Sequence, residues 1–226
     1  MFRKFEKTPR ILVPQIDIKG KLFLSDKEAK LLLGNKVTIL EKLDGANVGI
    51  IRHRDTFYLQ KRGSLVSTSE HVQYNFFKGW SMQNYDKLMS LPKDHIVYGE
   101  LMRCVHSIYY DKLPDWVCMF TIWSNKKKEY LPWSEVLNIV TNCGLCTVPV
   151  VDEGYFNKID LYNLIPKVSK YGTEKAEGIV LWNHRHQLRG KIVLPEFVKH
   201  LDEVDHWTHG PIRLNYVGGK RSENLD

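Results

Sequence analysis

A lysine between two strand-like runs is the feature of this sequence best suited to chemistry. Mostly apolar residues fill positions 37–40 and 48–51, and between them lies the heptad Glu41-Lys42-Leu43-Asp44-Gly45-Ala46-Asn47. Asp-Gly pairs favour turns, so we expect Lys42 at a strand edge beside a turn. A lysine amine held at the base of a pocket can attack an α-phosphate and retain the nucleotide covalently. The alternative is an exposed lysine on an ordinary hairpin, because Asp-Gly turns are common.

Four later stretches carry the residue types that a nucleotide pocket needs. They are Lys61-Arg62-Gly63-Ser64 after the expected hairpin, Tyr98-Gly99-Glu100 at a strand end, Glu177-Gly178-Ile179-Val180 at a strand start, and Gly190-Lys191-Ile192-Val193 opening another strand. Each stretch alone is weak evidence, because a glutamate at a strand end is usually a solvated residue. Their order along the chain, after the lysine heptad, is what favours one shared site.

The composition limits the class of protein. The chain has 226 residues, 43% of them hydrophobic and 12% aromatic, which suits one large domain or two small ones with a real core. Its net charge of +7 favours a polyanionic partner, although a merely basic soluble protein would carry the same charge. Residues 1–20 contain no apolar run of signal-peptide length, and no stretch is long enough to span a bilayer. We therefore expect an intracellular, cytoplasmic protein with no membrane partner.

The four cysteines, Cys104, Cys118, Cys143 and Cys146, indicate thiols rather than a metal site. A reducing compartment favours free thiols. Cys143 and Cys146 form a single C-x-x-C pair, whereas a tetrahedral zinc site needs four ligands. A metal or redox role for this pair is the less favoured alternative.

The elements that must position the candidate residues are mainly short strands. Strands are expected at 11–14, in a hairpin or meander over 37–62 that turns near Arg54 and Asp55, and at 96–101, 116–123, 147–151, 178–182 and 191–194. Helices are expected at 26–33, at 69–90, at 134–142 with Ser134 as N-cap and Gly144 past the end, at 157–168, and from Pro195 onward. Strands outnumber helices without strict alternation, so the predicted fold class is α+β, with mainly antiparallel sheets and flanking helices. The tail from Gly210 is expected to be mobile.

Taken in order, these stretches resemble the motif set of the covalent nucleotidyltransferases, which are the polynucleotide ligases and mRNA capping enzymes. Within that superfamily the chain most resembles the ATP-dependent RNA ligases, whose nucleophile motif has the form E-K-x-D/H-G-x-N. Two further segments are similar to theirs, namely Tyr98-Gly99-Glu100-Leu101 with His106-Ser107-Ile108-x-Tyr110 and Leu113-Pro114, and Lys191-Ile192-Val193-x-Pro195-Glu196-Phe197. The resemblance covers residues 37–199 and implies a ligase-type adenylyltransferase fold.

The resemblance implies a role for each matching position. Lys42 would become adenylylated by ATP, and Glu177 would help to organise a divalent metal, Mg²⁺ or Mn²⁺. The implied nucleotide contacts are Glu41 at the adenine edge, Phe120 stacked on the ring, Glu100 on the ribose hydroxyls, Arg62 and Asn47 on the phosphate or ribose side, and Lys191 on the α-phosphate.

Elementary chemistry agrees with these roles. A free lysine has a pKa of about 10.4, so only roughly one amine in a thousand is neutral and nucleophilic at pH 7. We expect nearby cations, Lys191 and the metal, to lower the pKa of Lys42 and to stabilise charge on the α-phosphate. Glu177 offers the hard oxygen ligands that Mg²⁺ prefers. Phe120 offers a face on which a base can stack, with an ordinary core phenylalanine as the alternative.

Two positions depart from the pattern of the family. Thr121 stands where an aspartate usually follows the stacking aromatic residue, and Val193 stands where many relatives have the second lysine of a K-x-K spacing. Arg189 or Lys199 would have to supply the positive charge of the missing second lysine. We expect an extension over residues 1–36 packed on the core, an adenylyltransferase domain over 37–200, and a short tail over 201–226 without the OB-fold of DNA ligases and capping enzymes.

The sequence therefore predicts an ATP-dependent RNA ligase. It would transfer AMP from Lys42 to a 5′-phosphate and seal that end to a 3′-hydroxyl, with RNA or an RNA-containing nicked duplex as its partner and no obligate protein partner. A DNA ligase or capping-type guanylyltransferase is the first alternative, and the expected lack of an OB-fold argues against it. A non-catalytic nucleic-acid-binding relative, or an enzyme that adenylylates ends without sealing them, is the second.

Overall fold

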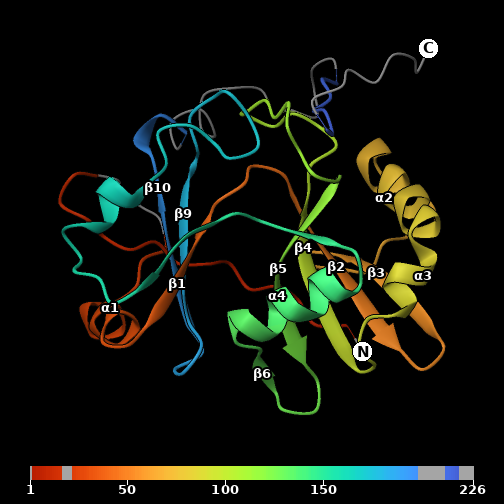
Figure 1. Cartoon of the computed structure of the whole chain (residues 1–226), viewed down its shortest axis with the longest axis horizontal. Coiled ribbons are helices and arrows are strands. Elements are labelled where there is room, and N and C mark those ends of the chain that lie inside the picture. The colour runs from red at the N-terminus through yellow and green to blue at the C-terminus, as the bar shows by residue number, and fades with distance from the viewer. Residues whose placement is uncertain (1, 17–21, 198–211, 219–226) are drawn as a thin grey trace.

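Two sheets lie side by side and form the body of the molecule (Figure 1). The structure is a computed structural model, and it describes residues 2–16, 22–197 and 212–218. Strand pairs are antiparallel within both sheets, except for one short parallel pair between β5 and β7. The predicted α+β class with mainly antiparallel sheets is confirmed.

The strands divide between the sheets as follows. The four-stranded sheet has the order β10-β9-β1-β8, with β1 (Val37–Glu41), β8 (Val150–Gly154), β9 (Gly178–Asn183) and β10 (Leu188–Val193). The second sheet has the order β3-β2-β4-β5-β6, with β7 paired to β5. Its strands are β2 (Ala46–His53), β3 (Thr56–Lys61), β4 (His95–Leu101), β5 (Val117–Ser124), β6 (Glu129–Tyr130) and β7 (Cys146–Thr147).

Helices flank the sheets. The capping box of Ser25 and Glu28 starts α1 (Asp26–Leu33), which contacts β9 and β10. The helices α2 (Val72–Gln83), α3 (Tyr85–Met89) and α4 (Trp133–Asn142) lie against the second sheet (Figure 1), and η1 (Leu161–Leu164) is a short 3₁₀ helix. A further helical segment begins at Pro195, as predicted, and its expected continuation past Phe197 lies outside the described residues. Within the described ranges, no helix is both long and apolar enough to cross a membrane.

Alternation along the four-stranded sheet separates two faces. Ile39 of β1 and Ile179 of β9 join Leu32 of α1 in one buried cluster. Leu40 and Trp182, on the opposite face, belong to a larger cluster built mainly on the second sheet. The four-stranded sheet is therefore covered by α1 on one side and faces the second sheet on the other.

Several local predictions are confirmed. The helix over 26–33 is α1, the turn near Arg54 joins β2 to β3, and the paired strands near 178–182 and 191–194 are β9 and β10. Each of these depends on a short-range signal, such as a cap, a turn or a hydrophobic run.

Prolines explain two predictions that were wrong. The helix expected over 157–168 is reduced to η1, because Pro166 lacks an N–H and favours the extended conformation seen at Ile165. The single strand expected over 147–151 is divided at Pro149 into β7 and the start of β8. Its two halves consequently join different sheets.

Other boundaries also differ from the prediction. The helix expected over 69–90 is two helices divided at Asn84. Ser134 lies inside α4 and is not its N-cap, whereas Gly144 does follow the helix end, with a φ of +67°. Residues 11–14 form no strand.

The segment 212–218 packs on the core, whereas the sequence predicted a mobile tail from Gly210. Leu214 forms an isolated bridge with Cys104. Asn215 is fully buried, and its Oδ1 accepts a hydrogen bond from the Tyr110 N–H at 2.9 Å. This part of the tail is therefore a structural element.

Candidate active site

A cavity of about 420 Å³ lies between the two sheets. Side chains from β1, β9 and β10 line one side of it, and side chains from β2, β4 and β5 line the other. Residues 5–8 and Arg10, which precede the first helix, form a further wall. Both sheets and the N-terminal segment thus meet at this cavity.

The structure brings all of the sequence-predicted site residues to the cavity. Seven of them line it, namely Glu41, Lys42, Asn47, Arg62, Glu100, Phe120 and Lys191. The eighth, Glu177, contacts the amine of Lys42. Their proximity is a finding, and the role of each one stays a prediction.

Hydrogen bonds fix Lys42 where β1 leaves its sheet. The Lys42 N–H donates to the carbonyl of Gly178, 2.9 Å away at the start of β9. The Asp44 N–H donates to the hydroxyl of Tyr110 at 3.0 Å, and the Asp44 carboxylate accepts from the Ser107 N–H at 2.7 Å. The heptad is therefore a crossing between sheets, and β1 and β2 do not form a hairpin.

Two glycines allow backbone segments to approach closely around Lys42. A Cβ at Gly178 would lie 2.0 Å from the carbonyl oxygen of Ile192 on β10. A Cβ at Gly45 would lie 2.6 Å from the carbonyl oxygen of Leu101. Both distances are far inside van der Waals contact, so any larger residue would shift the backbone that carries the lysine.

Carboxylates surround the amine of Lys42. Its Nζ lies 2.5 Å from Oε2 of Glu177. Burial lowers the pKa of Lys42, but the charges of Glu177, Asp44 and Glu100 together outweigh burial and raise that pKa above its usual value. The predicted lowering of the pKa is therefore wrong for the protein alone, in which the amine is held as an ammonium.

Burial shifts two other charged groups toward their neutral forms. It raises the pKa of Glu100 to about 7, against the opposing charges of Lys42 and Arg62. Burial and the charge of Lys42 lower the pKa of Lys191 to about 8. Perturbed ionisable groups that converge on one cavity are typical of functional sites.

The carboxylate of Glu41 is already engaged. The hydroxyl of Ser169 donates to one oxygen at 2.5 Å, and the Lys170 N–H donates to the other at 3.0 Å. Glu41 thereby anchors the segment after η1 to the end of β1. Although the residue borders the cavity, its carboxylate is not free to bond the edge of a base while these contacts persist.

Phe120 and Asn47 also line the cavity. The half-buried ring of Phe120 meets Phe5 edge to face, with ring centroids 5.2 Å apart. The Oδ1 of Asn47 is buried and has no hydrogen-bond partner among the described residues. A buried acceptor without a partner destabilises the folded state, and a donor on a ligand would satisfy it.

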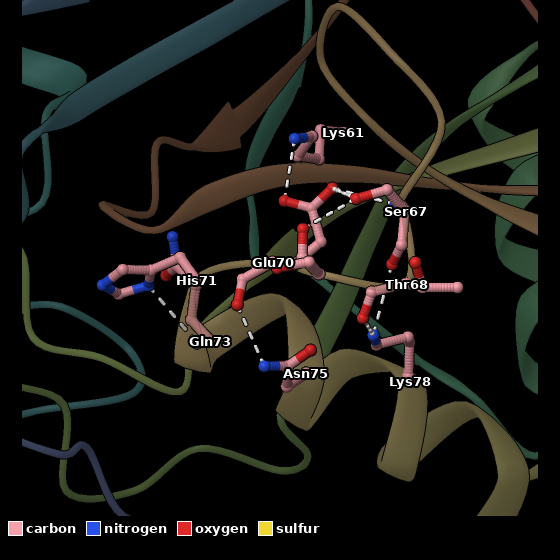
Figure 2. A network of polar contacts seen from close by, with 9 residues as sticks. Lys61, Ser67, Thr68, Glu70, His71, Gln73, Asn75 and Lys78 are labelled. Atoms are coloured by element: carbon pink, nitrogen blue, oxygen red, sulfur yellow. Dashed lines mark hydrogen bonds and ion pairs between the residues drawn. The ribbon is translucent and has the colours of Figure 1, made fainter.

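A polar network holds the loop that follows Arg62 (Figure 2). The Glu70 carboxylate accepts hydrogen bonds from the N–H and hydroxyl of Ser67 and from Nζ of Lys61, the last at 2.9 Å. Lys78 of α2 donates to two carbonyls of the same loop. The bonds from Ser67 and Lys61 lower the pKa of Glu70 to about 2, so the loop stays tied to β3 and α2 at neutral pH.

The N-terminal wall of the cavity is the part that the sequence analysis missed. The Phe5 N–H donates to the carbonyl of Arg62 at 3.1 Å, and the Ile11 N–H donates to the carbonyl of Lys191 at 2.9 Å. The segment thereby reaches both sheets. The only signal for it was a mixture of basic and apolar residues, a pattern common on ordinary surfaces.

The carboxylates near Lys42 suit a divalent metal ion that binds together with a ligand. The described part of the chain contains no group of three or more His, Cys, Asp or Glu side chains that could hold a metal ion, and the four cysteines are free thiols. Glu177 and Glu100 do bring two carboxylates to the amine of Lys42. Mg²⁺ in nucleotide sites usually binds one or two carboxylates together with substrate phosphates. The residues therefore fit a divalent cation shared with a polyphosphate.

Comparison with known proteins gives a family and a fold. The family model described as RNA ligase matches residues 35–193. No curated protein matches the chain in sequence. Among solved structures, the chain is similar to an RNA ligase of Naegleria gruberi with pyrophosphate, at 19% identity and a TM-score of 0.65. It is also similar to mutants of that ligase, one in the apo form at 20% identity and a TM-score of 0.67, and one with ATP and Mn at 19% and 0.65.

These similarities cover much more of this chain than of the solved structures. The shares are 89% of this chain and 59% of the pyrophosphate-bound ligase, 89% and 58% for the apo mutant, and 79% and 54% for the mutant with ATP and Mn. The chain thus spans less than two thirds of the length of the structures that it matches. At these identities the likeness shows a shared fold.

Proposed function

The chain belongs to the RNA ligase family, and we propose that it is an ATP-dependent RNA ligase that works through a lysyl-AMP intermediate. The observation that carries the proposal is the position of Lys42. Its amine lies beside the cavity with 22% of the side chain exposed, 2.5 Å from Glu177. The amine is therefore held in place and can still be reached by a ligand.

In the first step, the Nζ of Lys42 attacks the α-phosphorus of ATP. A bond forms between nitrogen and phosphorus, the bond from phosphorus to the bridging oxygen breaks, and pyrophosphate leaves. Lys191 binds an α-phosphate oxygen and stabilises the charge that develops there. A 5′-phosphate then takes the AMP from Lys42, and a 3′-hydroxyl displaces AMP to form the phosphodiester.

The amine has to lose its proton before it can attack. Glu177, Asp44 and Glu100 favour the ammonium form in the protein alone. A bound Mg²⁺ or Mn²⁺ would offset these carboxylates and favour the neutral amine. We assign Glu177 to that cation, together with phosphate oxygens of the nucleotide.

The remaining residues bind the nucleotide. Glu100 accepts hydrogen bonds from the ribose hydroxyls, and Phe120 offers its ring to the adenine. Asn47, whose Oδ1 lacks a partner, and Arg62 contact the phosphate or ribose side. The backbone N–H of Glu41 donates to the Pro149 carbonyl and its carboxylate is bonded to Ser169 and Lys170, so a contact of Glu41 with the adenine edge requires its backbone carbonyl or the release of one of these bonds.

We assign the adenylyltransferase domain to residues 37–200, with 1–36 as an extension packed on it and 201–226 as a tail. The net charge of +7 supports RNA, or a nicked duplex that contains RNA, as the partner. A cytoplasmic setting would supply ATP and keep the four thiols reduced.

Incubation with α-labelled ATP and Mg²⁺, followed by a denaturing gel, tests the proposal. The unaltered chain is expected to give a labelled protein band and Lys42→Ala to give none. The same variant should still seal RNA whose 5′ end is already adenylylated, since that step does not use the nucleophile. Lys36→Ala is the matched control, because Lys36 lies just before β1, is 58% exposed and pairs with Glu153.

Two outcomes would contradict the assignment. Persistent labelling of Lys42→Ala would exclude this lysine as the nucleophile. Labelling by GTP and not by ATP would indicate a capping-type guanylyltransferase instead.

A further inference from the structure

A buried arginine stands beside Lys191 in the wall of the cavity. Arg10 forms an isolated parallel bridge with Lys191. The Ile11 N–H donates to the Lys191 carbonyl, and the Lys191 N–H donates to the Pro9 carbonyl, each at 2.9 Å. Residues paired in a bridge point their side chains to the same face of a sheet. Arg10 and Lys191 therefore stand next to each other, and both line the cavity.

The guanidinium of Arg10 is a cation without a bonded partner in the described part of the chain. Only 8% of the residue is exposed, and no hydrogen bond or ion pair joins its guanidinium to another described residue. Burial lowers the pKa of Arg10, and the charge of Glu177 opposes that effect. An arginine remains charged at neutral pH. A partly buried charge of this kind is less well solvated than a free arginine, and a bound anion would offset that cost.

Of the two candidates that the sequence offers for a second cation beside Lys191, Lys199 lies outside the described residues and Arg189 is engaged elsewhere. The guanidinium of Arg189 donates to the Thr8 hydroxyl at 3.1 Å and to a backbone carbonyl at 2.9 Å, and it lies 4.5 Å from the centre of the Phe5 ring. Val193, two residues beyond Lys191, is buried and apolar. Arg10 reaches the cavity from a separate segment, so a search near Lys191 in the sequence does not find it.

The order of the strands places Arg10 beyond Lys191 as seen from Lys42. Across the sheet from β1 come β9, then β10 with Lys191, and then the segment that carries Arg10. Neighbouring strands lie about 4.8 Å apart. A triphosphate whose α-phosphate lies between Lys42 and Lys191 would therefore extend its outer phosphates toward Arg10.

We propose that Arg10 binds the β- and γ-phosphates of ATP and stabilises the departing pyrophosphate, an inference that rests on the proposed function. As the bond between the α-phosphorus and the bridging oxygen breaks, negative charge grows on the pyrophosphate. A guanidinium can bond two phosphate oxygens at once, which suits this task. The two later steps involve no β- or γ-phosphate, so Arg10 acts in the formation of lysyl-AMP and not in sealing.

Calorimetric titration with α,β-methylene-ATP and with AMP, each with Mg²⁺, tests this role. The methylene bridge blocks loss of pyrophosphate, so Lys42 can stay unaltered. Arg10→Gln is expected to weaken the binding of α,β-methylene-ATP about 10- to 100-fold and that of AMP less than about threefold, because it removes charge-assisted bonds to the outer phosphates only. Arg10→Lys keeps the positive charge but loses the planar guanidinium group. It should therefore weaken the binding of α,β-methylene-ATP less than Arg10→Gln does.

Arg185→Gln is the matched control. Arg185 is an exposed arginine in the turn between β9 and β10, so its loss changes the net charge equally and should leave both titrations unaltered. As a second readout, Arg10→Gln should slow the formation of lysyl-AMP and seal pre-adenylylated RNA at the unaltered rate.

The possible failures can be told apart. Equal weakening of both nucleotides, or no weakening of either in a variant with normal thermal unfolding, overturns the inference and leaves the proposed function intact. Failure of the unaltered chain to bind either nucleotide overturns both. If Arg10→Gln does not fold, Arg10→Lys takes its place. The inference then requires that Arg10→Lys weaken the binding of α,β-methylene-ATP more than that of AMP.

Discussion

The carboxylate of Glu100 destabilises the folded chain at neutral and alkaline pH. Burial raises its pKa from 4.5 to about 7, because the charges of Lys42 and Arg62 offset burial only in part. A folded state that binds a proton more tightly than the unfolded state loses stability as the pH rises between the two pKa values. The loss is complete above the folded pKa, where Glu100 is the charged acceptor that the proposed function assigns to the ribose hydroxyls.

Replacement of Glu100 by glutamine should therefore stabilise the chain in a pH-dependent manner. We expect Glu100→Gln to raise the free energy of unfolding by about 2 kcal/mol at pH 8 and by much less at pH 5, while nucleotide binding weakens. Urea unfolding at the two pH values measures the difference. Glu70→Gln is the control. Because the pKa of Glu70 is about 2, this substitution should change the free energy of unfolding equally at the two pH values. A pH-independent gain for Glu100→Gln would contradict the argument.

At the scale of elements, the start of β9 has no room for a side chain. The Cβ that Gly178→Ala would add lies 2.0 Å from the Ile192 carbonyl oxygen, so β9 and β10 would have to separate. We expect a loss of more than about 3 kcal/mol in the free energy of unfolding, at the severe end for point mutants. Gly63→Ala is the control, since its Cβ would meet nothing within 4 Å. Thermal unfolding of the two variants measures the contrast, and similar midpoints would refute the packing argument.

The segment 212–218 supports the turn after Lys42 through Tyr110. The Nδ2 of Asn215 donates to the Met102 carbonyl at 2.7 Å, and its Oδ1 accepts from the Tyr110 N–H. The Tyr110 hydroxyl in turn accepts the Asp44 N–H. A continuous series of contacts therefore connects this segment with the turn that follows Lys42, the proposed nucleophile.

Asn215→Ala should disturb both stability and chemistry. It leaves several buried backbone groups without partners, so we expect a loss of about 2–4 kcal/mol in the free energy of unfolding. Lys42 should still become adenylylated, but more slowly, because its turn is held less firmly. Chemical denaturation and single-turnover labelling measure the two effects. Asn142→Ala, at an exposed position of α4, should change neither, and a stable Asn215→Ala variant with slow labelling would separate positioning from folding.

The range of the interactions explains which elements the sequence could predict. The residues that favour α1 and the short apolar runs of β9 and β10 are local signals, and those elements were predicted. Pro166 is an equally local signal, because its missing N–H limits any helix over 157–168. The pairing of β1 with β8 and β9, in place of β2, depends on partners more than a hundred residues away and leaves no mark on residues 37–51.

The same distinction holds for the candidate site. Lys42 and Lys191 stand in ordered motifs, so their residue types and sequence neighbours were enough to select them. Arg10 and Asn215 lie in no motif, and their positions follow from contacts that only the folded chain reveals. The carboxylate of Glu41 was predicted to face a ligand, and the fold uses it to hold Ser169.

At the scale of the whole molecule, the net charge of +7 bears on how a substrate is held. A positive protein surface attracts the phosphate backbone of a duplex without reading its sequence, and this attraction weakens steeply with added salt. A template that already aligns two ends turns a three-body encounter into a two-body one. We therefore expect a nick in a duplex to be sealed faster than free single strands, at a rate that falls as salt is added.

The 3′-hydroxyl side of the nick is expected to be RNA. A terminal ribose offers a 2′-hydroxyl as donor and acceptor and imposes an A-like shape on the duplex end, and both features distinguish RNA from DNA. Four nicked duplexes that differ only in ribose or deoxyribose on each side of the nick, together with free single-stranded RNA, separate the two requirements. Sealing should depend strongly on ribose at the 3′ side and little on ribose at the 5′ side. Equal sealing of a deoxyribose 3′ end would refute the RNA requirement, and faster joining of free strands would refute the preference for nicks.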